Sequence, residues 1–191
     1  MKQRLVSVDK FYDNPLTVRK LALSTEYTNN ISKNSFLTEE AINKFSYILQ
    51  QDLVCLENSG HFLTAYANTP IDPINALPNV DWVALVYLNF PSQAEGQRSL
   101  SLYIHKQLNC ETLPNIEEQR VQGWNNLEEM YEGFVALEGQ QEELWQTWYT
   151  AFLRYNRAII FDAKLWHRQL QGFGDTINNC RLCQLFYFRN R

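Results

Sequence analysis

Short strand-like segments separated by turn residues are the feature that most constrains the fold of this chain. They are rich in β-branched and aromatic residues, and Gly, Pro or Asn separates most of them. The expected strands are residues 54–56, 61–67, 83–90, 99–105, 158–161 and 181–188. A length of 191 residues suits one substantial hydrophobic core, so we expect a single domain over 1–191.

Two amphipathic helices are expected before the main run of strands, after a short opening strand. Asn14 and Pro15 supply an N-cap and a first-turn proline for a helix over 15–26. A second helix is expected over 38–50, where acidic residues stand at its positive end. Residues 1–53 therefore read as a strand and support helices, ahead of a core over 54–191.

A helical insertion is expected within the core, at about 107–155, where acidic and aromatic residues follow a helical pattern. The expected helical segments are 116–124, 126–134 and 141–155. Helices outside several short strands indicate a mainly β or α+β domain. A jelly roll is one architecture that closes such strands into two facing sheets.

Charge and hydropathy exclude some partners. The net charge of -4 gives no electrostatic reason to expect nucleic acid or an anionic membrane. The longest uncharged apolar run, residues 82–88, is too short to cross a bilayer, and the first residues lack the apolar core of a secretory signal. We therefore expect a cytoplasmic protein with no nucleic-acid or membrane partner.

Histidines limit the metal sites that this chain can build, because it has only His61, His105 and His167. Phosphate-loop, nucleophile-elbow and zinc-helix signatures are absent. A multi-histidine site must draw on these residues or on carboxylates. For each histidine taken alone, a structural role as a hydrogen-bonded, partly buried ring is the stronger interpretation.

The most informative segment runs from Arg157 to Phe188. It reads as a strand ending near His167, a glycine-containing loop, and Arg181 on the next strand. An imidazole can ligate iron(II), and a guanidinium binds a carboxylate through two parallel hydrogen bonds. Both groups suit a dicarboxylate bound beside a metal.

This order resembles the C-terminal half of the iron(II)- and 2-oxoglutarate-dependent oxygenases, the prolyl-hydroxylase-like proteins with a double-stranded β-helix (jelly-roll) fold. Residues 81–89, which end in Tyr-Leu-Asn, resemble the early core strand of that family, and 101–106 resemble the next strand. The resemblance covers about 55–191. It implies iron(II), the cosubstrate 2-oxoglutarate, His167 as the distal metal ligand and Arg181 as the cosubstrate anchor.

The chain departs from the family pattern at the proximal metal ligands, because it has no His-x-Asp or His-x-Glu pair. Asp72 stands where the proximal histidine belongs, and Ile74 stands where the carboxylate belongs. In one interpretation, His167, Asp72 and either His105 or His61 hold iron in a rearranged set. The resemblance then implies hydroxylation of an unactivated C–H bond in a small molecule or peptide, with no catalytic residue beyond the metal ligands.

Two other interpretations stay open. In one, the metal site has decayed and the domain is a non-catalytic binding or scaffolding module. In the other, the chain is a structural jelly roll that does not need His167 or Arg181.

Tyrosines on neighbouring strands can donate a hydroxyl to the cosubstrate, although core packing is the more usual role of such rings. Tyr66, Tyr87 and Tyr103 are the candidates, and Tyr87 is predicted to bind the cosubstrate together with Arg181. The primary substrate and the oligomeric state leave no trace in the sequence.

Overall fold

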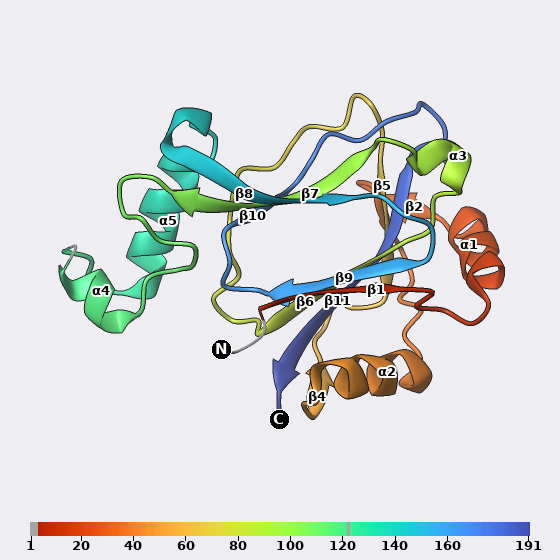
Figure 1. Cartoon of the computed structure of the whole chain (residues 1–191), viewed down its shortest axis with the longest axis horizontal. Coiled ribbons are helices and arrows are strands. Elements are labelled where there is room, and N and C mark those ends of the chain that lie inside the picture. The colour runs from red at the N-terminus through yellow and green to blue at the C-terminus, as the bar shows by residue number, and fades with distance from the viewer. Residues whose placement is uncertain (1–3, 122) are drawn as a thin grey trace.

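The computed structural model describes residues 4–121 and 123–191 and contains two facing antiparallel sheets (Figure 1). Eight strands form the larger sheet: β1 (Leu5–Asp9), β2 (Tyr27–Thr28), β3 (Ile31–Ser32), β4 (Leu53–Cys55), β5 (His61–Ala65), β6 (Trp82–Tyr87), β9 (Arg157–Asp162) and β11 (Arg181–Asn190). Their order is β1-β9-β6-β11-β5-β3-β2, with β4 also paired to β11. The smaller sheet has the order β10-β7-β8, from β10 (His167–Gln169), β7 (Arg98–His105) and β8 (Trp145–Phe152). The predicted jelly-roll class is confirmed.

Strand β6 is buried on both faces, which explains its continuous apolar sequence. Val83, Leu85 and Tyr87 face the smaller sheet and contribute to the core between the two sheets. The alternate residues, Trp82 among them, contribute to a second core on the outer face of the larger sheet. The period of two along a strand therefore places one sequence run in two cores.

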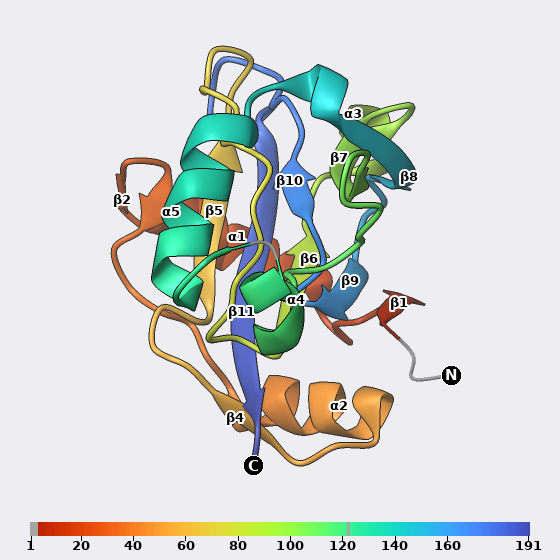
Figure 2. The same cartoon turned by 90° about the vertical axis from the view of Figure 1, so that its left-hand side faces the viewer.

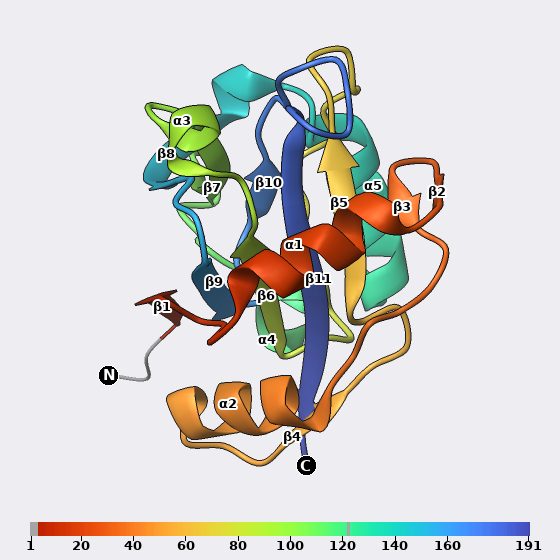
Figure 3. The same cartoon turned by 90° about the vertical axis from the view of Figure 1, so that its right-hand side faces the viewer.

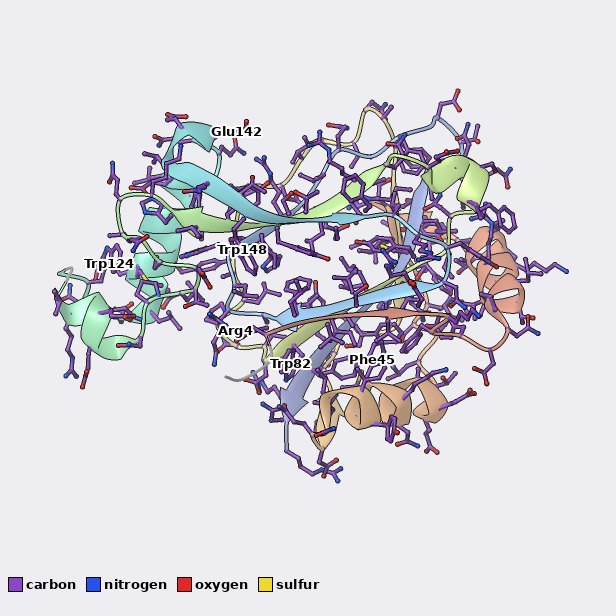
Figure 4. The ribbon with its side chains drawn as sticks, in the orientation of Figure 1. Arg4, Phe45, Trp82, Trp124, Glu142 and Trp148 are labelled. Atoms are coloured by element: carbon purple, nitrogen blue, oxygen red, sulfur yellow. The ribbon has the colours of Figure 1, made fainter. Side chains whose placement is uncertain are left out.

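Helix α2 (Glu39–Leu49) covers that outer face, and Phe45 and Trp82 lie between the helix and the sheet (Figure 4). The helix begins where the sequence predicts, because the Thr38 hydroxyl accepts a hydrogen bond from the Ala41 backbone N–H at 3.2 Å. It ends at Gln50, whose backbone is left-handed with a φ of 53°.

Helix α1 (Pro15–Ser24) is the other predicted support helix and crosses one end of the molecule (Figure 3). The Asn14 side chain caps it by accepting a hydrogen bond from the Thr17 N–H at 3.3 Å. Ala22 packs with Phe62 and Leu88 in a small core beneath this helix.

The opposite end carries α4 (Ile116–Val121) and α5 (Leu127–Glu138), with α5 in the foreground of Figure 2. Two shorter helical turns are α3 (Pro91–Ala94) and η1 (Glu142–Leu144). The helix expected over 141–155 is wrong, because most of that segment is strand β8. Its aromatic residues and threonines favour an extended backbone, and β8 pairs with β7 along its length. The helical insertion therefore ends near residue 144.

Within the described ranges, no helix combines the length and the apolar character that crossing a membrane requires.

Candidate functional site

Arg181 reaches from the larger sheet toward the smaller one and is only 5% exposed. Its Nη1 donates hydrogen bonds to the carbonyls of Leu170 and Ser99, the second at 3.3 Å, and its Nη2 donates to Gln169 Oε1 at 3.2 Å. A guanidinium has five N–H donors, so the Nε–H and one Nη2–H remain for a ligand. No carboxylate of the described residues lies within ion-pair distance of Arg181.

A cavity of about 460 Å³, which we call the inner cavity, lies beside this guanidinium. Strands β5 and β11 form one side, and the loop around Asp72 and the end of β10 form the other. Its lining includes Leu63, Asp72, Gln169, Arg181, Cys183 and Tyr187. The cavity thus combines a buried cation with apolar walls, an arrangement that suits a small anionic molecule.

Tyr87, which the sequence analysis predicts to bind the cosubstrate, lies close to Arg181. Tyr87 on β6 pairs with Cys183 on β11, which shares a strand face with Arg181. Burial raises the pKa of the Tyr87 hydroxyl and Cys183 raises it further, whereas the Ser99 hydroxyl and the Arg181 guanidinium lower it. The tyrosine is therefore a neutral group within the electrostatic reach of the anchor.

His167 on β10 is 8% exposed, and its ring meets Phe161 edge-on with 4.8 Å between centroids. Its Nδ1 lies 2.7 Å from the Leu165 carbonyl. Because a carbonyl only accepts, Nδ1 carries the hydrogen and Nε2 keeps its lone pair. Burial lowers the pKa of His167 to about 4. His167 is therefore neutral near pH 7, in the tautomer that ligates metals through Nε2.

The residues expected to join His167 do not gather around it. Asp72 is exposed at the rim of the inner cavity, close enough to Tyr187 to raise the pKa of that hydroxyl, after the larger effects of burial and Cys183. Ile74, at the expected carboxylate position, is buried in the core beneath α5. His61 is half-buried on β5, where its Nδ1 lies 2.7 Å from the Ser32 carbonyl.

His105 faces the α5 side of the smaller sheet, where its ring meets Trp145 edge-on at 4.8 Å. The Leu108 backbone N–H donates to its Nδ1 at 3.3 Å, so Nε2 carries the hydrogen. That Nε2 lies 2.9 Å from Glu138 Oε2. Burial lowers the pKa of His105, and Glu138 opposes that effect. Both ring nitrogens are engaged within the protein.

The described residues do not fit a three-ligand iron site. Across 4–121 and 123–191, no three His, Cys, Asp or Glu side chains come close enough together to hold a metal ion. Non-heme iron(II) oxygenases use two histidines and one carboxylate on one face of the metal. His167 meets one of these requirements, so the metal-ligand roles of His167, Asp72 and His105 stay predictions.

Sequence reasoning missed the groups that position Arg181, namely Gln169 and the carbonyls of Ser99 and Leu170. Gln169 has a readable signal, because it lies two residues after His167 and therefore on the same face of an extended strand. The two carbonyls have none, since every residue carries that group. The other candidate tyrosines are not at the anchor: Tyr103 lies on the outer face of the smaller sheet, and Tyr66 is not among the cavity-lining residues.

Comparison with known proteins finds likeness in structure alone, since no family model and no curated protein matches by sequence. HygX from Streptomyces hygroscopicus, solved with nickel, 2-oxoglutarate and hygromycin B bound, matches with a TM-score of 0.56 and 10% identity. The match covers 99% of this chain and 84% of that chain. SnoN, a non-heme alpha-ketoglutarate-dependent epimerase from nogalamycin biosynthesis, matches with a TM-score of 0.51 and 12% identity over 99% of this chain and 79% of that chain.

This chain has their jelly-roll fold. A second HygX structure, with nickel and 2-oxoglutarate bound, gives a TM-score of 0.52 at 12% identity over 99% of this chain and 84% of that chain.

Proposed function

We propose that this chain is a 2-oxoglutarate-binding protein of the oxygenase kind, with Arg181 as the anchor for the cosubstrate's far carboxylate. One observation carries the proposal: a buried guanidinium with two unused donors and no carboxylate partner among the described residues borders a cavity of about 460 Å³. HygX holds 2-oxoglutarate in two of its structures and SnoN depends on the same compound, which supports the choice of ligand.

The chemistry of binding follows from the geometry of the anchor. The Nε–H and the free Nη2–H of Arg181 suit side-on, two-bond recognition of a carboxylate. The bonds from Arg181 to Ser99, Leu170 and Gln169 hold the guanidinium in place before the ligand arrives, which lowers the entropy lost on binding. A bound carboxylate also supplies the countercharge that the buried cation lacks. Asp72 opposes an anion, but it lies exposed at the rim, where water screens its charge.

The oxygenase resemblance further implies iron(II) and hydroxylation of a small molecule or peptide. The donor set around His167 does not fit that metal, so the geometry supports no reaction step through iron. The hydroxylase activity is proposed on the fold and the resemblance alone. The other interpretation, a non-catalytic binding module, keeps the anchor and dispenses with the metal.

Calorimetric titration with 2-oxoglutarate tests the proposal on metal-stripped protein. We expect binding by the wild type and a roughly tenfold to hundredfold weaker affinity for Arg181→Gln, because charge-assisted hydrogen bonds are lost. Arg189→Gln is the matched control, since Arg189 is an exposed arginine on the same strand. Failure of the wild type to bind 2-oxoglutarate, or equal affinity for Arg181→Gln, would contradict the proposal.

Repeating the titration with manganese(II) separates the oxygenase from the binding module. An oxygenase site would bind 2-oxoglutarate more tightly with metal, and His167→Ala would remove that gain. A cosubstrate affinity that is indifferent to metal in the wild type would leave the binding module as the function.

A further inference from the structure

A second cavity, which we call the outer groove, lies on the face of the smaller sheet that points away from the larger sheet. Its volume is about 700 Å³. The floor is a polar row across three strands, because Ser101 on β7 pairs with both Arg168 on β10 and Thr150 on β8. The hydroxyls of Ser101 and Thr150 are hydrogen-bonded at 2.9 Å. Arg98, near the start of the same strand as Ser101, also lines the groove.

The shape of this face differs from that of an ordinary solvated sheet. Helix α5 covers one end of this face, where Tyr103 and Trp145 pack with Met130. Polar residues are expected on the part that no helix covers, and they normally extend from a flat surface into water. Here the loop residues Ile71, Gly96 and Gly172 border the polar row and make the surface concave. Small-molecule sites are typically concave with a few convergent polar groups.

Arg168 is held close to the floor of the groove instead of extending into water. Its side chain is 12% exposed, and the guanidinium lies over the Tyr103 ring, 5.5 Å from the centroid. Its Nη2 donates to Glu142 Oε1 at 2.8 Å. Its Nε is buried and has no hydrogen-bond acceptor among the described residues. A buried donor in this state favours the approach of an acceptor.

Charge in the outer groove favours an anion. Glu142 is the acidic residue that lines it, and its side chain is 75% exposed, on the outer side of the smaller sheet (Figure 4). An ion pair so open to water contributes little, so an incoming anion can displace Glu142 at small cost. Arg98 is exposed and has no ion-pair partner within the described part of the chain. Arg98 and Arg168 together exceed Glu142 by one positive charge.

We propose that the outer groove binds a small molecule through a carboxylate or phosphate group. The anion takes the place of Glu142 at the Nη2 and Nε edge of Arg168, and Arg98 supplies the second cation. The hydroxyls of Ser101 and Thr150 line the same groove and offer a donor to the ligand. This site is separate from the inner cavity and from Arg181, which lines only the inner cavity.

Titration with inorganic phosphate and with acetate, at matched ionic strength in chloride, tests this proposal on the full chain. We expect Arg98→Gln and Arg168→Gln each to weaken binding roughly tenfold or more, because each loses charge-assisted hydrogen bonds. Glu142→Gln removes the competing carboxylate and is expected to tighten binding by up to about fivefold. Arg154→Gln is the matched control, since it removes an exposed arginine outside the groove.

The two ions distinguish the ligand chemistries: tighter binding of phosphate assigns a phosphate ligand, and equal or tighter binding of acetate assigns a carboxylate. Arg98 is exposed, so its variant tests the site even if Arg168→Gln fails to fold. Arg98 does not line the inner cavity, so Arg98→Gln should weaken phosphate binding and leave 2-oxoglutarate affinity unchanged. Failure of 2-oxoglutarate binding and failure of the outer groove are therefore separate results. Wild-type protein that binds neither ion, or arginine variants that bind like wild type, would overturn the proposal.

Discussion

His167 and His105 lie on neighbouring strands of the smaller sheet, are both buried, and differ in what their ring nitrogens contact. His167 faces the core between the sheets and gives one nitrogen to a backbone carbonyl, which leaves Nε2 as a lone-pair donor. His105 faces α5 and uses both nitrogens, one toward Leu108 and one toward Glu138. Burial alone therefore does not mark a ligand. What distinguishes a candidate is the nitrogen that the protein has left unused.

Acid should reveal the largest difference between the two histidines. In the folded protein burial lowers the pKa of His167 to about 4, below the value of about 6.5 in an unfolded chain. The unfolded state therefore takes up the proton first, and stability that is complete above pH 6.5 is lost as the pH falls toward 4. The expected loss from His167 is up to about 3 kcal/mol, since each pKa unit corresponds to about 1.4 kcal/mol.

Urea unfolding of wild type and His167→Gln at pH 7 and pH 4 measures this loss. The variant should lose less unfolding free energy on acidification than the wild type. It should still lose some, because burial lowers the pKa of His105 as well. Parallel losses in the two proteins would show that His167 is not a buried neutral group.

Breaking the pair at His105 should have the next largest effect. In Glu138→Leu the buried Nε2–H of His105 loses the carboxylate oxygen that lies 2.9 Å away. We expect a loss of about 1 to 3 kcal/mol of unfolding free energy at pH 7, the usual range for a buried donor left without its acceptor. Glu138→Gln is the matched control, because it retains an oxygen acceptor and should lose less. Equal stability of the leucine variant and wild type would remove the structural role of the pair.

Changing Asp72 should have the smallest effect on the measured free energies. It tests whether His167 has a carboxylate partner, as His105 has in Glu138. Glu138 Oε2 lies 2.9 Å from His105 Nε2, whereas Asp72 is exposed at the cavity rim. In Asp72→Asn the loss of a like charge should tighten metal-free 2-oxoglutarate binding by up to about fivefold, the scale of an exposed charge interaction. Asp52→Asn, which changes an exposed aspartate outside the inner cavity, should not alter affinity. If Asp72 were a metal ligand, its variant would instead weaken binding measured with manganese(II).

Local signals allowed much of the fold to be predicted from sequence. Thr38 and Asn14 predict where their helices begin, because the capping hydrogen bond joins residues only three positions apart. The apolar run of β6 also identifies a buried strand without knowledge of its neighbours. Strand β8 was missed because the acidic residues before Trp145 extend a helical pattern. The strand itself depends on pairing with β7, whose partner residues lie 40 (His105 and Trp145) to 54 (Arg98 and Phe152) positions earlier in the sequence.

The candidate site likewise has a part that the sequence predicts and a part that depends on packing. His167 and Arg181 could be selected because their residue types and order suggest metal binding and carboxylate binding. The facing direction of His105 could not, because it depends on which side of β7 meets α5, and that is a property of the packed sheet. The outer groove was equally hidden, since Ser101, Arg168 and Thr150 form a row only after three strands have paired.

Ile71, Leu170 and Gly172 line both the inner cavity and the outer groove, so one layer of chain forms a partition between them. Gly172 packs so tightly against the backbone of Ala65 and Tyr66 that a Cβ there would collide with both. Any larger residue in place of Gly172 would displace the end of β5, which borders the inner cavity. A substitution in the partition that changes the wall of one cavity therefore also changes the wall of the other.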